Sequence, residues 1–174
     1  AIGDAALELS IDAIEKAVEE NPAWDRRPAV THIQLADEKE LNRMAELGII
    51  AVPQPVWFKK DKTYTNIEVP YLGEYRAMHE YPMKSFFIKG IIAAGATDTI
   101  ADYLDPLYGI QMAVTRKGQG NGETLNPDEK ISIEAAIKAY TYNGAYSMYL
   151  EDRVGSIEVG KEADLVILDK NLLE

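Results

Sequence analysis

Apolar residues recur at helical spacing over residues 4–20, near the start of the chain. Charged residues fill the positions between them, so one face of this segment is apolar and the other is polar. The pattern predicts an amphipathic helix that ends at Asn21 and Pro22, a pair that terminates helices. The apolar face consists of Leu7, Ile11, Ile14 and Val18.

Three later segments are short, apolar and rich in β-branched residues, a composition typical of buried parallel strands. They are Pro28–Gln34, Ile49–Val52 and Ile91–Thr97. A helical pattern follows the first of them, because Asp37 with a Glu three residues later forms a capping box. Gly48 ends that helix.

Helical and strand patterns alternate along most of the chain. A helix is predicted over residues 72–89, with an interruption near Pro82. This alternation implies parallel strands joined by crossover helices, which is an α/β architecture. Two further helices are expected over residues 105–114 and 133–148, and two loops over residues 57–70 and 117–126.

The last part of the chain changes character. The pattern predicts a strand with a turn over Gly155–Gly160 and a final strand over Ala163–Asp169. These segments form a β unit outside the α/β series. We therefore expect one unit over residues 1–150 and a C-terminal β segment over residues 151–174.

Composition narrows the classes of function. The chain has 174 residues, 47% hydrophobic and 27% charged, as in an ordinary globular protein. A net charge of −11 argues against nucleic acid and anionic membranes as partners, since both repel an acidic surface. The absence of cysteine excludes disulfides and thiolate chemistry in this segment. The compartment is not fixed by these features, although the cytoplasm is favoured.

His32 and Asp98 stand where the first and third predicted strands give way to polar loops. The carboxyl ends of parallel strands converge on one face, which is where (β/α) barrels build active sites. An imidazole and a carboxylate at such ends can bind a metal ion. A lone histidine beside a strand is more often structural, however, and Asp98 could equally cap the following segment. The residues alone leave both readings open.

Several short motifs lie at the ends of the predicted strands and in the tail of the chain. Thr31-His32-Ile33-Gln34 and Ala51-Val52-Pro53-Gln54-Pro55 follow the first two strands, and Ala94-Gly95-Ala96-Thr97-Asp98 ends the third. Gly155–Val166 forms a long motif in the tail. Together they resemble the metal-dependent amidohydrolase superfamily, most closely its YtcJ-like subgroup, which includes N-substituted formamide deformylases. Shorter matches lie at residues 1–5, 105–106, 113–116 and 139–141.

The resemblance covers nearly the whole chain and implies its fold. It implies the C-terminal part of a (β/α)₈ TIM barrel, strands 6 to 8 with their helices, plus part of a small C-terminal β domain. The first five residues resemble a segment that follows a metal-binding histidine, and Ala1 is not an initiator Met. We therefore expect a piece of a longer protein whose other metal ligands lie upstream.

The resemblance also implies a reaction and its residues. His32 would be the strand-6 metal ligand, and Asp98 the strand-8 ligand and catalytic residue. The cofactor would be a divalent metal, zinc in the full-length enzyme, with an incomplete site in this chain. The substrate would be a small molecule whose amide or formamide-type C–N bond, other than a peptide bond, is hydrolysed. Asp98 would take a proton from water and pass it to the leaving amine. Gln54, Trp57 and Arg76 are candidates for the substrate pocket.

Two departures from the family pattern keep a second hypothesis open. Thr31 replaces a family glutamate, and Thr97 replaces the more usual serine. A non-catalytic α/β binding or assembly module that has lost its metal site would also fit. Two ligands rarely hold zinc, and a partial barrel exposes sheet edges. We therefore expect the isolated chain to be inactive and metal-free, and to self-associate.

Overall fold

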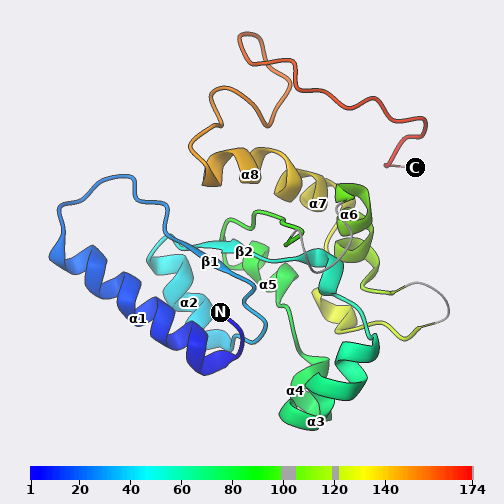
Figure 1. Ribbon diagram of the computed structural model, residues 1–174. Helices are drawn as coiled ribbons and strands as arrows, with labels where there is room; N and C mark the ends of the chain where they lie inside the picture. Colours follow the sequence, from blue (N-terminus) through cyan, green and yellow to red (C-terminus); the bar gives the residue numbers. More distant parts are fainter. Residues whose placement is uncertain (99–104, 119–121, 174) are drawn as a thin grey trace.

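A short parallel sheet lies at the centre of the computed structural model, which describes residues 1–98, 105–118 and 122–173 (Figure 1). β1 (Ala29–Thr31) pairs with β2 (Ile50–Val52) in parallel. The segment 91–97 lies on the other side of β2, where Ala51 and Ala93 form a parallel bridge. The predicted α/β class is confirmed, but the paired strands are shorter than the apolar runs that predicted them.

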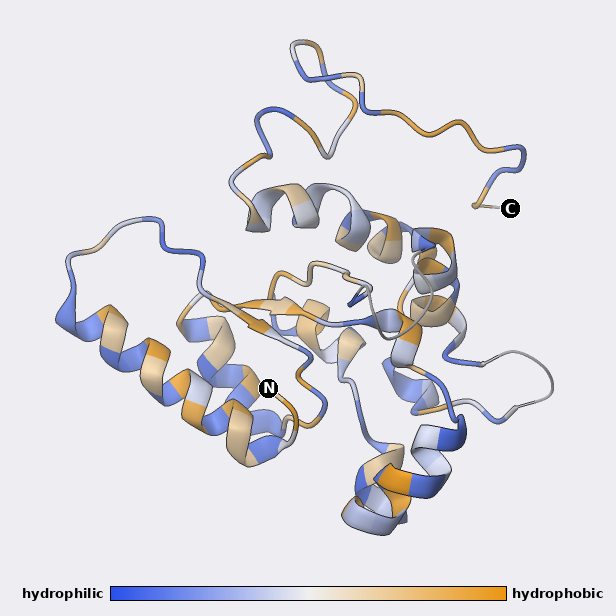
Figure 2. Ribbon diagram, in the orientation of Figure 1, coloured by the Kyte–Doolittle hydropathy of each residue, from blue (hydrophilic) through white to orange (hydrophobic). Residues whose placement is uncertain are grey.

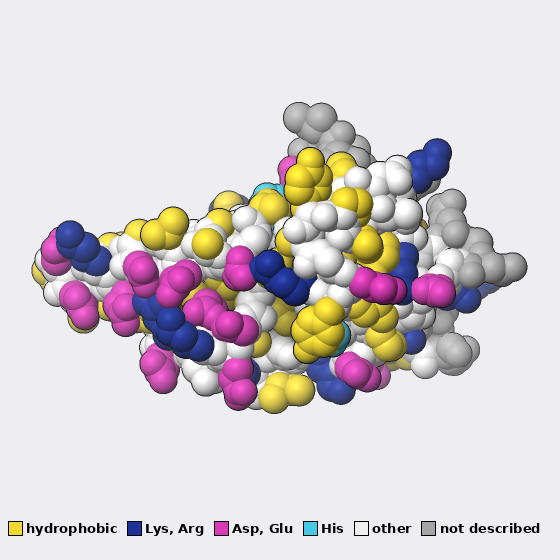
Figure 3. Space-filling view, turned by 90° about the horizontal axis from the view of Figure 1, so that it is seen from below, with side chains coloured by type: hydrophobic (Ala, Val, Ile, Leu, Met, Phe, Trp, Pro, Cys, Tyr) yellow, Lys and Arg dark blue, Asp and Glu magenta, His cyan; other side chains and the backbone are white. Residues whose placement is uncertain are grey.

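Two helices follow the sequence closely. α1 (Asp4–Glu20) has the predicted range, and α2 (Glu38–Glu46) connects β1 to β2. The two helices pack against each other (Figure 1), and side chains of both charges cover this part of the surface (Figure 3). Arg43 bridges the helices by pairing with Asp12 at 2.6 Å and Glu15 at 2.7 Å. The predicted capping box does not form, because the Asp37 side chain makes no cap hydrogen bond.

Residues 55–88 contain more short helices than the sequence predicted. The predicted loop over 57–70 is wrong for most of its length, since much of it is helical. The predicted helix over 72–89 is broken because Gly73 has a φ of +78° and because Pro82 has no N–H to donate. The elements are η1 (Pro55–Trp57), η2 (Tyr64–Glu68), α3 (Val69–Leu72), α4 (Glu74–Met78) and α5 (Met83–Ile88).

Helices of the second half cover the segment 91–97. α6 (Pro106–Thr115) is capped by Asp105, whose carboxylate accepts the Leu107 N–H at 2.9 Å. The helix predicted over 133–148 is interrupted at Thr141, whose backbone leaves the helical region. The Asn143 side chain donates to the Ala93 carbonyl at 2.9 Å and fixes this layer on the sheet. The elements are η3 (Pro127–Glu129), α7 (Ile133–Tyr140) and α8 (Tyr142–Ser147).

Tyr140 packs where two glycines leave room for its ring. A Cβ atom at Gly95 would lie 2.6 Å from the ring, and one at Gly109 would lie 2.0 Å from the hydroxyl oxygen. The hydroxyl donates to the Ala96 carbonyl at 3.4 Å. Close approach therefore requires glycine at both positions.

The tail extends away from the body of the molecule (Figure 1). Its predicted strands, Gly155–Gly160 and Ala163–Asp169, are wrong for this structure: residues 151–173 contain no paired strand. A strand needs a neighbour for its backbone hydrogen bonds, and none lies beside the tail in the described part of the chain. Apolar residues recur along the tail (Figure 2), and side chains such as Ile157 and Ile167 are 88% and 96% exposed. The division near residue 150 stays a prediction.

Over the described residues, no helix combines enough length with enough apolar character to cross a membrane.

Candidate active site

His32 lies at the carboxyl end of β1, in a strained conformation. Its φ is +72°, a region that residues other than glycine rarely adopt and that is frequent at functional sites. The His32 N–H donates to the Val52 carbonyl at 3.1 Å, which extends the β1–β2 ladder by one residue. The imidazole stacks on Trp57 with ring centroids 5.0 Å apart and an interplanar angle of 15°. Backbone and ring are therefore both held in place.

Gln54 determines which imidazole nitrogen is free. His32 Nδ1 lies 2.8 Å from Gln54 Oε1, and Gln54 Nε2 donates to the Val52 carbonyl at 3.0 Å. Because the amide nitrogen is committed to Val52, the oxygen faces the imidazole and accepts from Nδ1–H. Nε2 then keeps its lone pair. A metal-binding histidine commonly donates its other N–H in this way, so His32 fits the role of a ligand.

Asp98 follows the segment 91–97 at the same edge of the sheet. The Ala96 N–H donates to the Pro53 carbonyl at 3.0 Å, so this segment runs beside β2 to the carboxyl edge where His32 lies. The carboxylate is exposed, and the residue has a φ of +55°. Over the described residues, no three His, Cys, Asp or Glu side chains are grouped closely enough to hold a metal ion. The two expected ligands thus form part of a metal site at most.

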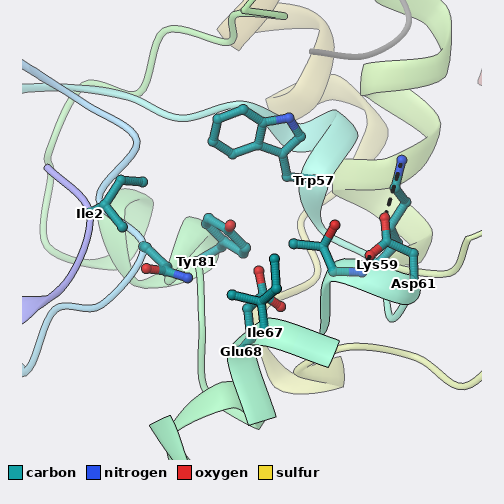
Figure 4. A pocket seen from close by; sticks show the side chains of 9 residues that line it. Ile2, Trp57, Lys59, Asp61, Ile67, Glu68 and Tyr81 are labelled. Carbon is teal, nitrogen blue, oxygen red and sulfur yellow. Dashed lines mark hydrogen bonds and ion pairs between the residues drawn. The ribbon is translucent and has the colours of Figure 1, made fainter. Parts of the chain in front are cut away.

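A cavity of about 380 Å³ opens next to this edge (Figure 4). Trp57 lies across it from Ile67 and Glu68, and Lys59 and Asp61 lie at one end. Its remaining lining residues are Ile2, Gln34, Thr63 and Tyr81.

The predicted pocket residues occupy three different settings. Trp57 lines the cavity, whereas Gln54 is 1% exposed and supports His32 instead. Arg76 is exposed on α4 and pairs with Asp4 at 2.6 Å, away from the cavity lining. Contact of any of the three with a substrate stays a prediction.

A buried carboxyl group behind the cavity was missed by the sequence reasoning. Glu80 is 0% exposed, and its Oε1 accepts from Gln34 Nε2 at 2.8 Å. Burial, reinforced by the nearby Glu68 carboxylate, raises the pKa of Glu80 to about 9. Glu80 therefore holds a proton at neutral pH and can donate it in a hydrogen bond to Glu68. The available signal was the Tyr81-Pro82 pair, which places Glu80 in the turn after a helix and not on its solvated face.

Arg116 supports this turn from beneath. Its guanidinium donates to the carbonyls of Leu125 at 2.8 Å, Glu80 at 2.9 Å and Tyr81 at 3.1 Å. The side chain is fully buried and lies over the Phe58 ring, 4.5 Å from its centroid. Burial lowers the pKa of Arg116 to about 10, so the guanidinium remains charged at neutral pH.

Comparison with known proteins identifies the family. Residues 1–174 match the Amidohydro_3 family, described as "Amidohydrolase family". The fold agrees with that class: a metal-dependent hydrolase from Pyrococcus horikoshii OT3 superposes with a TM-score of 0.82 and 27% identity, over 99% of this chain and 33% of that one. The chain therefore belongs to the amidohydrolase family.

Two curated relatives match almost the whole chain. YtcJ of Bacillus subtilis (strain 168), named for the amidohydrolase class, is 35% identical over 170 residues and 97% of this chain. N-substituted formamide deformylase of Arthrobacter pascens is 29% identical over 172 residues and 98% of this chain. The chain spans 31% of the length of each of these relatives. The predicted resemblance to this superfamily is confirmed.

Proposed function

We propose that this chain is the C-terminal part of a metal-dependent amidohydrolase that cleaves a non-peptide C–N bond, of amide or formamide type, in a small molecule. The barrel assignment, strands 6 to 8, belongs to the same proposal. The observation that carries it is the His32–Gln54 pair, which leaves Nε2 free at the carboxyl end of a parallel strand. The name of the Arthrobacter relative supports the formamide-type substrate.

His32 and Asp98 would hold a divalent cation, zinc in our proposal, together with ligands from other parts of the protein. Such a cation polarises the substrate carbonyl and lowers the pKa of water. Gln54 keeps His32 Nδ1 protonated, so the ring stays in one tautomer and one orientation. Asp98 accepts a proton from the attacking water and delivers it to the leaving nitrogen, which departs as a neutral amine.

The test is hydrolysis of a panel of N-substituted formamides and simple amides by the full-length protein. His32→Ala should lower the bound metal and reduce kcat/KM by roughly 100-fold or more, whereas Asp98→Asn should reduce kcat by about 10²- to 10⁴-fold. His79→Ala is a matched control, because this imidazole is exposed and its hydrogen bond and ring contact among the described residues are with Tyr75, four residues earlier. Full metal content and activity in His32→Ala would overturn the role given to His32, whereas neither bound metal nor hydrolysis in the unsubstituted full-length protein would favour the non-catalytic module.

A further inference from the structure

The cavity connects directly to His32 through Trp57. The indole lines the cavity and also stacks on the imidazole. A substrate whose C–N bond lies near His32 would therefore extend past Trp57 into the cavity. The polar groups of the cavity wall determine what kind of substituent it can hold.

The charges on the cavity wall leave one carboxylate uncompensated. Lys59 lies 4.0 Å from Asp61, and the two face each other at one end (Figure 4). Asp61 also accepts the backbone N–H groups of Thr63 at 2.8 Å and Tyr64 at 3.3 Å. In the described part of the chain, no lysine or arginine forms an ion pair with Glu68. Glu68 is thus the negative charge that the cavity offers to a ligand.

The buried carboxyl group of Glu80 is a second, independent observation that points to a ligand at Glu68. It is fully buried between two residues that line the cavity, Gln34 and Glu68. Its Oε2 has no hydrogen-bond donor among the described residues. Two adjacent carboxylates offer only acceptors, so among the described residues this oxygen gains a partner when Glu80 is protonated and donates to Glu68. Partial burial raises the pKa of Glu68; that hydrogen bond acts in the opposite direction, orients the carboxylate and, together with a bound cation, favours its ionised form.

We propose that the cavity binds a cationic nitrogen of the substrate, such as an alkylammonium group, with Glu68 as its counter-ion. Trp57 and Tyr81 supply aromatic surface, which attracts organic cations. Glu80 is a positioning residue that acts through Glu68. The inference deepens the proposed function, on which it rests, by naming a substrate class: amides or formamides that carry a basic group.

The donor set favours an organic cation over a divalent metal ion. Hard cations such as Ca²⁺ and Mg²⁺ require six or more oxygen ligands. Asp61 is already bound to Lys59 and two backbone N–H groups, and Glu80 Oε1 is bound to Gln34. One carboxylate beside aromatic rings matches a single positive charge on an apolar stem.

The experiment measures binding rather than turnover. Ligand-observed NMR titrations of the full-length protein would compare n-butylammonium, butan-1-ol and butyrate, three probes with the same apolar chain. We expect n-butylammonium to bind at least about 10-fold more tightly than the other two. Glu68→Gln should abolish that preference, whereas Glu80→Gln should retain it within about 3-fold, because an amide also donates a hydrogen bond to Glu68.

Glu74→Gln is the matched control, since Glu74 is exposed on α4 and does not line the cavity. Equal binding of the three probes to the unsubstituted protein would overturn the inference, whatever the variants do. Unchanged binding in a folded Glu68→Gln variant would also overturn it. The titration is repeated in His32→Ala, which removes the proposed metal ligand. Selective binding there, without formamide hydrolysis by the unsubstituted protein, would support the cation site while the proposed function failed.

Discussion

Two polar networks flank the carboxyl edge of the sheet, and they differ in charge. The His32–Gln54–Val52 network is neutral, and each of its hydrogen bonds joins one donor to one acceptor. The Gln34–Glu80–Glu68 network contains two carboxyl groups and depends on a proton. A carboxyl pair is costly to bury and changes with pH, so it is better suited to recognition of charge than to support of the fold.

The largest expected effect is a loss of stability on substitution of Arg116, which holds the backbone of the turn that carries Glu80. Arg116→Met should destabilise the protein by about 3 kcal/mol or more, because it removes three hydrogen bonds from a charged donor to buried carbonyls. Thermal and urea unfolding would measure the loss. Arg153→Met, which removes an exposed ion pair with Glu162, should cost less than about 1 kcal/mol. Equal losses in the two variants would contradict the role given to Arg116.

The next effect is the pH dependence of Glu80. Its folded-state pKa of about 9 lies above its ordinary value of 4.5. Between these values the folded protein holds a proton that the unfolded chain has lost, so stability falls as pH rises. Relative to Glu80→Gln, the unsubstituted protein should lose up to about 1.4 kcal/mol per pH unit between pH 6 and 8.

Four groups face Glu80 and could contribute to the same titration. Glu68 and Arg116 act on it directly, and the buried hydroxyls of Tyr64 and Tyr81 both interact with its charge. Stability curves from pH 5 to 9 for the unsubstituted protein, Glu80→Gln and the exposed control Glu74→Gln would isolate the Glu80 contribution. Parallel curves for the unsubstituted protein and Glu80→Gln would show that Glu80 does not hold the proton.

A smaller effect tests the neutral network. Gln54→Ala removes the acceptor of His32 Nδ1–H and should weaken metal binding by about 10- to 100-fold. Competition with a chromogenic chelator would measure the affinity. Gln111→Ala is the control, because Gln111 lies exposed on α6. A metal affinity unchanged by Gln54→Ala would separate this network from the proposed metal site.

The smallest expected change in stability comes from an exposed ion pair outside both networks. Arg76→Ala removes the exposed pair with Asp4 and should change stability by less than about 1 kcal/mol. Kinetics of the same variant would test the sequence-based prediction that Arg76 lies in the substrate pocket. A large rise in KM would support that prediction, in contrast to the position of Arg76 outside the cavity lining.

The sequence predicted regular elements better than contacts between distant residues. The range of α1 followed from one continuous apolar stripe, and the parallel strands followed from apolar runs. Sequence patterns did not reveal Glu80, because burial of that carboxyl depends on Arg116 holding its backbone from 36 residues away. The tail strands failed for a related reason: Ala163–Asp169 has strand composition, but pairing depends on a neighbour that composition does not specify.

Tyr140 occupies space that only two hydrogen-sized side chains leave open, one at Gly95 and one at Gly109. Substitutions at these three positions are therefore expected to depend on one another in evolution. Where a relative carries alanine at either glycine, we expect a residue smaller than tyrosine in place of Tyr140.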